Sequence, residues 1–229
     1  MIEFRAVSFG YDDQETILES VDSRILPGLT LLVGPNGCGK STLLKLAAGV
    51  EIPDKGRITV DGFDLWKDEV AARIKLAYLP EQADLTPYAS IKDIVRLVCR
   101  LRGEPAESGM KALRFFGLQE VSPRTVRELS LGQRRRAVFA AVMIGQPAHL
   151  LLDEPLEGMD RKISGEILAW VRRRIESGAS VVVVSHILEP FLDLASQAIT
   201  VKQGRVLTYD ALPESPDEKL ATLDLIAKG

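Results

Sequence analysis

The chain has 229 residues, of which 46% are hydrophobic, and its formal net charge is −3, so it can bury one domain core and nucleic acid is not expected as its main partner. It contains no run of the ~18 apolar residues that a membrane-spanning helix needs. Its two cysteines, Cys38 and Cys99, do not have the spacing of a metal-binding pair, which favours a reduced, cytoplasmic protein.

The first sixty residues predict short strands separated by turns. Residues 2–9 alternate between apolar and polar side chains, as a half-buried strand does, and Tyr11 follows them. Further strands are predicted at about 22–26 and 56–62, and the apolar run 29–33 is typical of a fully buried strand. We therefore expect an antiparallel β layer beside the strand at 29–33. Tyr11 could stack on a base or could simply end its strand.

The segment after the buried strand has the pattern of a phosphate-binding loop. Its residues are Gly34, Pro35, Asn36, Gly37, Cys38, Gly39, Lys40, Ser41 and Thr42. Glycines allow backbone conformations that a Cβ would forbid, so successive N–H groups can surround a phosphate at the start of the following helix. Lys40 would reach the β- and γ-phosphates, and the Ser41 hydroxyl would ligate Mg²⁺. The alternative is a glycine-rich turn that binds nothing.

The middle of the chain, residues 84–127, predicts helices and no strand. Before it, a strand predicted at 75–79 leads to Gln82. One helix is expected to begin at Ser90, and another to cover 107–116, which makes this region a helical lobe inserted in an α/β core. The apolar stripe of the first helix is expected to join the core, with a partner-binding surface as the alternative. The stripe consists of Ile91, Ile94, Val95, Val98 and Leu101.

Residues 129–133 precede three arginines and an Ala- and Val-rich helix that extends to Ile144. Ser130 has the position of a helix N-cap, and together with Gly132 it offers a second anion site at a helix N-terminus. The arginines at 134–136 predict a solvated or salt-bridged helix face rather than a nucleic-acid patch.

Two later strands end in polar residues. The apolar strand 149–154 ends in Asp153 and Glu154, and the valine run 181–184 leads to His186. Because parallel strands bind ligands at their carboxyl edge, Asp153 is suited to hold Mg²⁺ through water and Glu154 to orient an attacking water. His186 becomes a candidate phosphate contact at the same edge.

The remaining elements complete the expected core. A helix is predicted over 161–177, and strands at 198–202 and 205–209 predict a closing hairpin. Residues 210–229 are polar and predict a tail with room for a short helix.

Together these residues resemble the nucleotide-binding subunit of an ATP-binding cassette (ABC) transporter over nearly the whole chain. The resemblance rests, in order, on Tyr11, residues 34–42, Gln82, Leu129 to Gln133, Leu150 to Glu154, Asp160 and His186. A phosphate loop occurs in many enzymes, but an LSxGQ segment shortly before an LLLDE strand is specific to this family. No N-K-x-D element is present, which disfavours a GTPase.

The resemblance implies a fold as well. It is an α/β fold with a P-loop NTPase core and parallel sheet, an N-terminal antiparallel β layer and an inserted α-helical subdomain. The single ATPase domain would span 1–229. The core and β layer would occupy 1–82 and 145–209, the helical subdomain about 84–144, and the short tail 210–229.

The resemblance further implies how one subunit binds ATP. Tyr11 would stack on adenine, and Gly34 to Thr42 would wrap the phosphates, with Lys40 acting on the reacting phosphates. Ser41, Gln82 and Asp153 would hold Mg²⁺. Glu154 would act as general base, Gln82 would also touch the attacking water, and His186 would clamp the γ-phosphate.

Other implied roles need a second subunit. In the family, two subunits pack head to tail and sandwich two ATP molecules, as a homodimer or a heterodimer. Ser130, Gly132 and Gln133 would contact the γ-phosphate bound to the opposite subunit, and Asp160 would act across the interface. The helical lobe and the loop around Gln82 would dock on a transmembrane permease at the inner face of the membrane.

Three positions depart from the family pattern. Leu131 replaces the first glycine of LSGGQ, and Leu156 and Met159 stand where threonine and leucine are common. None of these removes a catalytic group, so ATP hydrolysis is expected. The compact length and the Leu-Ser-Leu-Gly form favour export. The alternatives are a soluble ATPase of iron–sulfur assembly and a nucleotide switch that does not turn over.

Overall fold

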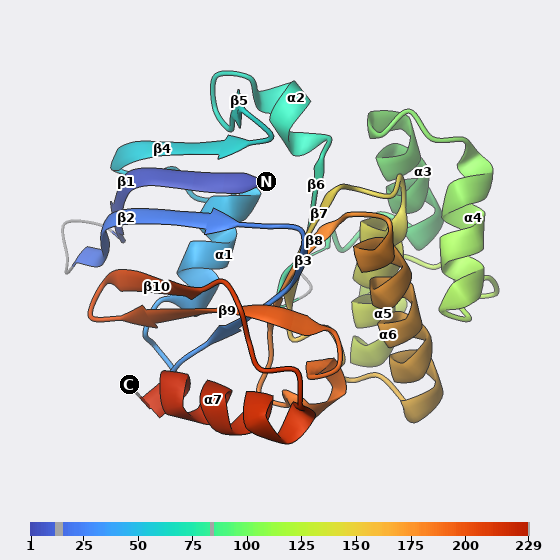
Figure 1. Ribbon diagram of the computed structural model, residues 1–229. Coiled ribbons are helices and arrows are strands. Elements are labelled where there is room, and N and C mark those ends of the chain that lie inside the picture. The colour runs from blue at the N-terminus through green and yellow to red at the C-terminus, as the bar shows by residue number, and fades with distance from the viewer. Residues whose placement is uncertain (12–15, 83–84, 229) are drawn as a thin grey trace.

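Two β-sheets form the centre of the structure, a computed structural model that describes residues 1–11, 16–82 and 85–228 (Figure 1). The smaller sheet is antiparallel and has the strand order β2-β1-β4-β5. Its strands are β1 (Ile2–Gly10), β2 (Thr16–Ile25), β4 (Lys55–Val60) and β5 (Phe63–Asp64). This sheet is the antiparallel layer that the sequence predicts.

The larger sheet has the order β10-β9-β3-β8-β7-β6. All of its strands run parallel except β10, which forms a hairpin with β9. The strands are β3 (Gly28–Val33), β6 (Leu76–Leu79), β7 (His149–Asp153), β8 (Ser180–Val184), β9 (Ala195–Lys202) and β10 (Arg205–Tyr209). The predicted hairpin is therefore confirmed.

Helices cover both faces of the larger sheet (Figure 1). The α-helices of the described chain are α1 (Lys40–Ala48), α2 (Glu69–Arg73), α3 (Ile91–Leu101), α4 (Ala106–Phe115), α5 (Leu131–Met143), α6 (Arg161–Glu176) and α7 (Pro216–Lys228). Of these, α3 and α4 lie farther out from the sheet, against α5 (Figure 1). The helices α3, α4 and α5 pack on one another, and α5 also meets α6 where the rings of Phe139 and Trp170 lie 5.9 Å apart.

The side chains of each central strand alternate between two hydrophobic clusters. In β8, Val181 and Val183 pack with the cluster that includes α5, α6 and α7. Val182 and Val184 pack instead with the cluster that includes α1 and the smaller sheet. A strand buried on both faces needs apolar residues at every position, which explains the uninterrupted valine run.

The parallel strands bring the predicted site segments to one edge of the sheet. The carboxyl ends of β3, β7 and β8 lead into the loop 34–39, into Glu154 and into His186. Register pairs Leu31 with Val183, and Asp153 with Val184, so these ends lie next to one another. This edge is where parallel α/β sheets bind ligands.

The structure adds detail to the predicted elements at three places. The second strand begins at Thr16 rather than near 22, with an irregularity around Ser20, whose positive φ of 47° interrupts the alternation. The short helix α2 was not predicted, because five residues are too few for a periodic pattern. The helix for which the tail has room is present as α7, which has 13 residues and buries Leu223 and Ile226 against the core. Residues 84 and 229, which bound two of the predicted regions, lie outside the described residues.

The predicted apolar stripe of α3 is only partly core. Ile91 and Val95 are buried as expected, but Leu101 is 71% exposed. In the described part of 84–127 no strand forms apart from an isolated bridge between Ser90 and Thr125, as predicted. None of the described helices is both long and apolar enough to cross a membrane.

Candidate functional site

A cavity of about 350 Å³ opens at the carboxyl edge of the larger sheet. Most of the predicted phosphate-binding loop and the start of α1 line it, including Lys40 and Ser41, but Gly34, Pro35 and Cys38 do not. Asp153, Glu154 and His186 also line it. Three separate segments of the chain thus meet around one cavity, as their strand ends require.

The backbone of the loop has the conformation that the sequence predicts. Gly34, Gly37 and Gly39 all have positive φ, with values of 141°, 78° and 108°. At Gly34 an added Cβ would also lie 3.0 Å from the Cys38 sulfur. Gly39 is the N-cap residue of α1 and has no side chain to cap it, so the first N–H groups of the helix are available to an anion in the cavity.

The Lys40 ammonium lies over the loop that precedes it. Its Nζ donates hydrogen bonds to the carbonyl oxygens of Gly34, at 2.8 Å, and Pro35, at 2.9 Å. This arrangement places a positive charge beside the helix N-terminus, so both contribute to an electropositive anion site.

Asp153 is a buried acid that faces the same cavity. Its side chain is almost inaccessible to water, and this burial is the main reason why the pKa of its carboxyl is raised. A hydrogen bond from the Ser41 hydroxyl opposes that shift, and the charges of Glu81 and Glu154 reinforce it. A hydroxyl and a carboxylate crowded by other acids form a donor set that suits Mg²⁺, which prefers oxygen ligands.

Glu154 is held by the segment that follows β8. Its carboxylate accepts a hydrogen bond from the His186 backbone N–H at 2.8 Å and another from the Ser185 hydroxyl at 3.1 Å. The ring of His186 is largely exposed, and its Nε2 lies 3.7 Å from the same carboxylate. Glu154 also has a positive φ of 48°, a strained conformation for a residue with a side chain.

Several predicted site residues lie outside the lining of this cavity. Tyr11 is partly exposed at the end of β1, edge-on to Phe9 and with Lys45 Nζ 5.8 Å from its ring centroid. Gln82 instead lines a second cavity of about 510 Å³ together with Leu131 and Gly132. Glu81 lines both cavities and so marks where they approach each other.

The segment before α5 caps its own helix. Ser130 is the N-cap residue, as predicted, and its side chain accepts from the Gln133 backbone N–H. The Gln133 side-chain oxygen in turn accepts from the Ser130 N–H at 3.1 Å. Asp160 likewise caps α6 and forms an ion pair with Arg136 at 3.5 Å. Neither segment lines the phosphate-loop cavity.

The prediction of a solvated arginine face is wrong for Arg135. Its side chain is buried, and its guanidinium donates to the backbone carbonyls of Pro80, Glu81, Asp153 and Glu154. The helical period contains the missed signal. Arg135 shares a face with the buried Val138, Phe139 and Val142 at spacings of three, four and seven residues.

Comparison with known proteins identifies the family. The profile of the ABC transporter family matches residues 19–157, which is more than half of the chain. The chain belongs to the ABC transporter family. An ABC transporter ATP-binding protein of Pyrococcus abyssi is 31% identical over 98% of this chain and 87% of its own length.

Other relatives of this ABC protein carry names for different roles, one for import and one for drug resistance. The molybdenum import ATP-binding protein ModC of Rhodopseudomonas palustris is 34% identical over 82% of this chain and 52% of its own length. The daunorubicin resistance ATP-binding protein DrrA3 of Streptomyces coeruleorubidus is 33% identical over 89% of this chain and 66% of its own length.

A solved ATP-binding subunit of an ABC transporter has the same fold. It superposes with a TM-score of 0.85 over 98% of this chain and 99% of that chain, at 24% identity. The predicted fold class and the predicted family are therefore confirmed. The chain is the ATP-binding subunit of an ABC transporter and an ATP hydrolase of the ABC type.

Proposed function

We propose that the chain hydrolyses Mg²⁺–ATP in the cavity beside the phosphate loop, and that it does so as one half of a closed dimer. The observation that carries this proposal is the separation of the predicted residues into two groups. Most of the loop 34–42 surrounds one cavity together with Asp153, Glu154 and His186, while Gly132 lines another. A γ-phosphate in the first cavity therefore needs Ser130 and Gly132 from a second subunit.

Within one subunit, each group has a chemical task. The N–H groups of the loop and the Lys40 ammonium bind the phosphates. Ser41 and Asp153 would hold Mg²⁺, which would neutralise charge on the phosphates. Glu154 takes a proton from the water that attacks the γ-phosphorus, and the bond between that phosphorus and the ADP oxygen breaks. His186 holds the γ-phosphate beside Glu154 and fixes the distance for the attack. Gln82 directly follows Glu81, which lines this cavity, and is assigned contact with Mg²⁺ and the attacking water as part of the proposal.

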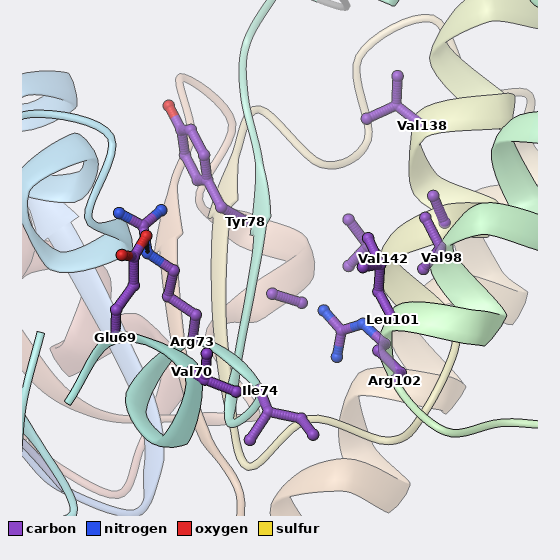
Figure 2. A pocket seen from close by; sticks show the side chains of 12 residues that line it. Glu69, Val70, Arg73, Ile74, Tyr78, Val98, Leu101, Arg102, Val138 and Val142 are labelled. Atoms are coloured by element: carbon purple, nitrogen blue, oxygen red, sulfur yellow. Dashed lines mark ion pairs between the residues drawn. The ribbon is translucent and has the colours of Figure 1, made fainter.

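We also assign the chain to a single ATPase domain that docks on a separate permease. The core and β layer would comprise 1–82 and 145–209, and the helical subdomain about 84–144. An apolar groove of about 470 Å³ supports the docking (Figure 2). Val70 and Ile74 line one side of it, and Val98, Leu101 and Val142 line the other.

The groove combines apolar and charged lining residues. Arg73 forms an ion pair with Glu69 at 3.0 Å, and Arg102 donates to the Leu76 carbonyl, so the apolar residues are what remains for a partner, and the apolar face of a short amphipathic helix would fit (Figure 2). Docking in this groove would hold the subunit at the inner, cytoplasmic face of a membrane. Export remains the proposed direction because of the Leu-Ser-Leu-Gly form, and transport into inside-out vesicles would measure it.

The first test is the mass of the Glu154→Gln protein in solution, with and without ATP and Mg²⁺. Doubling of the mass with ATP supports a homodimer whose Leu131-containing segment is functional. A monomer that still binds ATP contradicts the homodimer and calls for a second, different subunit.

The permease is tested separately by co-purification from membranes. Leu101→Glu should abolish it, whereas Leu225→Glu should not, because Leu225 is equally exposed but lies on α7, away from the groove. Co-purification that is insensitive to Leu101→Glu would contradict docking in this groove. Association with an iron–sulfur assembly protein instead of a permease would support the alternative function.

A further inference from the structure

We propose that Arg135 is a positioning residue that joins the backbone before Gln82 to the backbone of Asp153 and Glu154, so that these groups keep one relative geometry for ATP hydrolysis. This inference rests on the proposed function of the cavity. The inference adds a residue on α5 that contacts neither the nucleotide nor the metal. Arg135 instead determines the positions of the side chains that bind them.

The contacts of Arg135 carry the inference. One terminal nitrogen, Nη1, donates to the carbonyls of Pro80 and Glu81, immediately before Gln82. The other, Nη2, donates to the carbonyls of Asp153 and Glu154, at 2.6 Å each. A single guanidinium therefore holds the ends of two neighbouring strands, β6 and β7.

Burial makes these contacts consequential. Arg135 is only 6% exposed, so each carbonyl oxygen would lose its partner without replacement by bulk water if the guanidinium were removed. The charge itself is compensated by nearby acids, including Glu81, Asp153 and Glu157. A planar fork with several donors can satisfy such diverging acceptors, whereas a lysine ammonium on a flexible stem offers no fixed geometry.

The position of Arg135 on α5 extends this role. The helix begins with the Ser130–Gln133 capping box, which lies one turn before Arg135. A shift of this helix is therefore transmitted through Arg135 to the Glu154 backbone, whose strained φ already depends on its surroundings. Contact between α5 and a second subunit would in this way reach the general base.

A second arginine provides a matched control. Arg174 Nη2 donates to the carbonyls of Gln146 and Pro147, at 2.8 and 2.7 Å, just before the opposite end of β7. Both arginines thus fasten backbone at the ends of the same strand, but only Arg135 does so at the cavity. Arg174→Lys should lower the stability of the fold without changing the geometry of the site.

The test compares Arg135→Lys with Arg174→Lys. We expect Arg135→Lys to lower kcat at least tenfold, because small misplacements of reacting groups cost about 10²-fold. ATP affinity in EDTA should stay within twofold, because the phosphate loop is untouched. In the Glu154→Gln background, the gain in ATP affinity on adding Mg²⁺ should shrink severalfold. Arg174→Lys should leave the kcat and this gain unchanged at temperatures where it is folded.

Two results would overturn the proposal. One is a kcat and a Mg²⁺ gain for Arg135→Lys that match those of Arg174→Lys. The other concerns Arg135→Gln, the variant to use if the lysine variant does not fold, since its neutral amide still donates two hydrogen bonds. We expect the kcat of Arg135→Gln to fall as well, while its ATP affinity in EDTA stays unchanged. An unchanged kcat for this variant refutes the proposal. Wild-type protein that hydrolyses no ATP would instead refute the proposed function itself.

Discussion

The backbone N–H of His186 donates a 2.8 Å hydrogen bond to the Glu154 carboxylate, which joins the end of β8 to the end of β7. The Ser185 hydroxyl adds a second bond at 3.1 Å. These bonds orient the carboxylate and still leave it lone pairs, as a general base requires. One bond comes from His186, the proposed phosphate contact, and the other from its neighbour Ser185, so the proposed base and the proposed phosphate clamp form one structural unit.

Replacement of Glu154 by Gln should separate ATP binding from hydrolysis. The amide keeps an acceptor oxygen for the His186 N–H but cannot accept the proton of water, so kcat should fall by about 10²–10⁴-fold. ATP affinity should remain close to that of the wild type. The measurement is phosphate release at steady state beside direct nucleotide binding, and turnover near the wild-type rate would show that another group is the base.

Loss of the Lys40 ammonium should mainly affect binding. Lys40→Ala removes the charge of the phosphate loop and also two hydrogen bonds to the Gly34 and Pro35 carbonyls. We expect most of the ATP affinity to be lost, together with a small decrease in the Tm of the nucleotide-free protein. Lys67→Ala, outside the cavity, is the control, and an unchanged affinity for Lys40→Ala would refute the role of Lys40.

The Cys38 thiol reports whether the loop is occupied. Cys38 is partly exposed within the loop, whereas Cys99 is buried on α3, so alkylation of the folded protein should modify Cys38 first. Bound ATP should slow that reaction. Labelling rates are measured by mass spectrometry with Cys38→Ser as the blank, and equal rates with and without ATP would exclude the proposed position of the nucleotide.

The sequence places the candidate residues at the correct edge of the sheet because the ends of strands are local features of the sequence. Asp153 and His186 follow apolar runs, and the position of a residue after a parallel strand determines its place in the sheet. The same runs indicate an α/β core, whereas the P-loop NTPase fold class is what the family resemblance implies. The loop glycines likewise have the positive φ that their spacing implies.

The sequence does not predict contacts that depend on packing between distant segments. Arg135 looked like one of three surface arginines, although its carbonyl partners lie 18 to 55 residues away in the chain. Leu101 fits a helical stripe, but nothing in the described chain covers it. Gln82 directly follows Glu81, which lines the phosphate-loop cavity, but Gln82 itself lines the second cavity. Each depends on how α5 packs against β6 and α3 against α5, which periodicity alone does not specify.

Acid should destabilise the fold through His149. This residue is buried in β7, with its Nε2 3.0 Å from Asp61, and Lys75 and the Met1 ammonium also face that carboxylate. Burial is the main reason why the His149 pKa is lowered, with the neighbouring ammonium adding to the effect. The unfolded chain then binds a proton more readily than the folded one. His149 therefore stabilises the fold above about pH 6.5, and this contribution is lost as the pH falls further.

The measurement is the urea midpoint between pH 7.5 and 5 for the wild type and His149→Gln. The variant should show a flatter profile, and equal slopes would contradict the assignment.

Asp61 acts at lower pH. Burial would raise its pKa, but the Met1 ammonium, His149 and Lys75 lower it to about 2. Its contribution is thus present above about pH 4 and is lost toward pH 2, outside the range of this experiment.

Replacement of Asp153 by Asn should stabilise the nucleotide-free protein while removing its response to Mg²⁺. Burial and the nearby Glu81 and Glu154 raise the pKa of Asp153, so its ionised form at neutral pH destabilises the fold. Asn has the same shape, lacks the charge and can still accept from Ser41. The Tm should rise by roughly 2–4 °C for each kcal/mol of relieved repulsion in a chain of this size.

The same Asp153→Asn protein should bind ATP equally well with and without Mg²⁺, because the metal loses its carboxylate. Asp193→Asn is the control, since Asp193 is exposed and outside the cavity, and neither its Tm nor its Mg²⁺ response should change. A lower Tm for Asp153→Asn would mean that the carboxylate is a stabilising group of the fold. A retained Mg²⁺ response would place the metal elsewhere. A higher Tm together with a lost Mg²⁺ response in Asp153→Asn is the result expected if this buried acid is kept for function at the expense of stability.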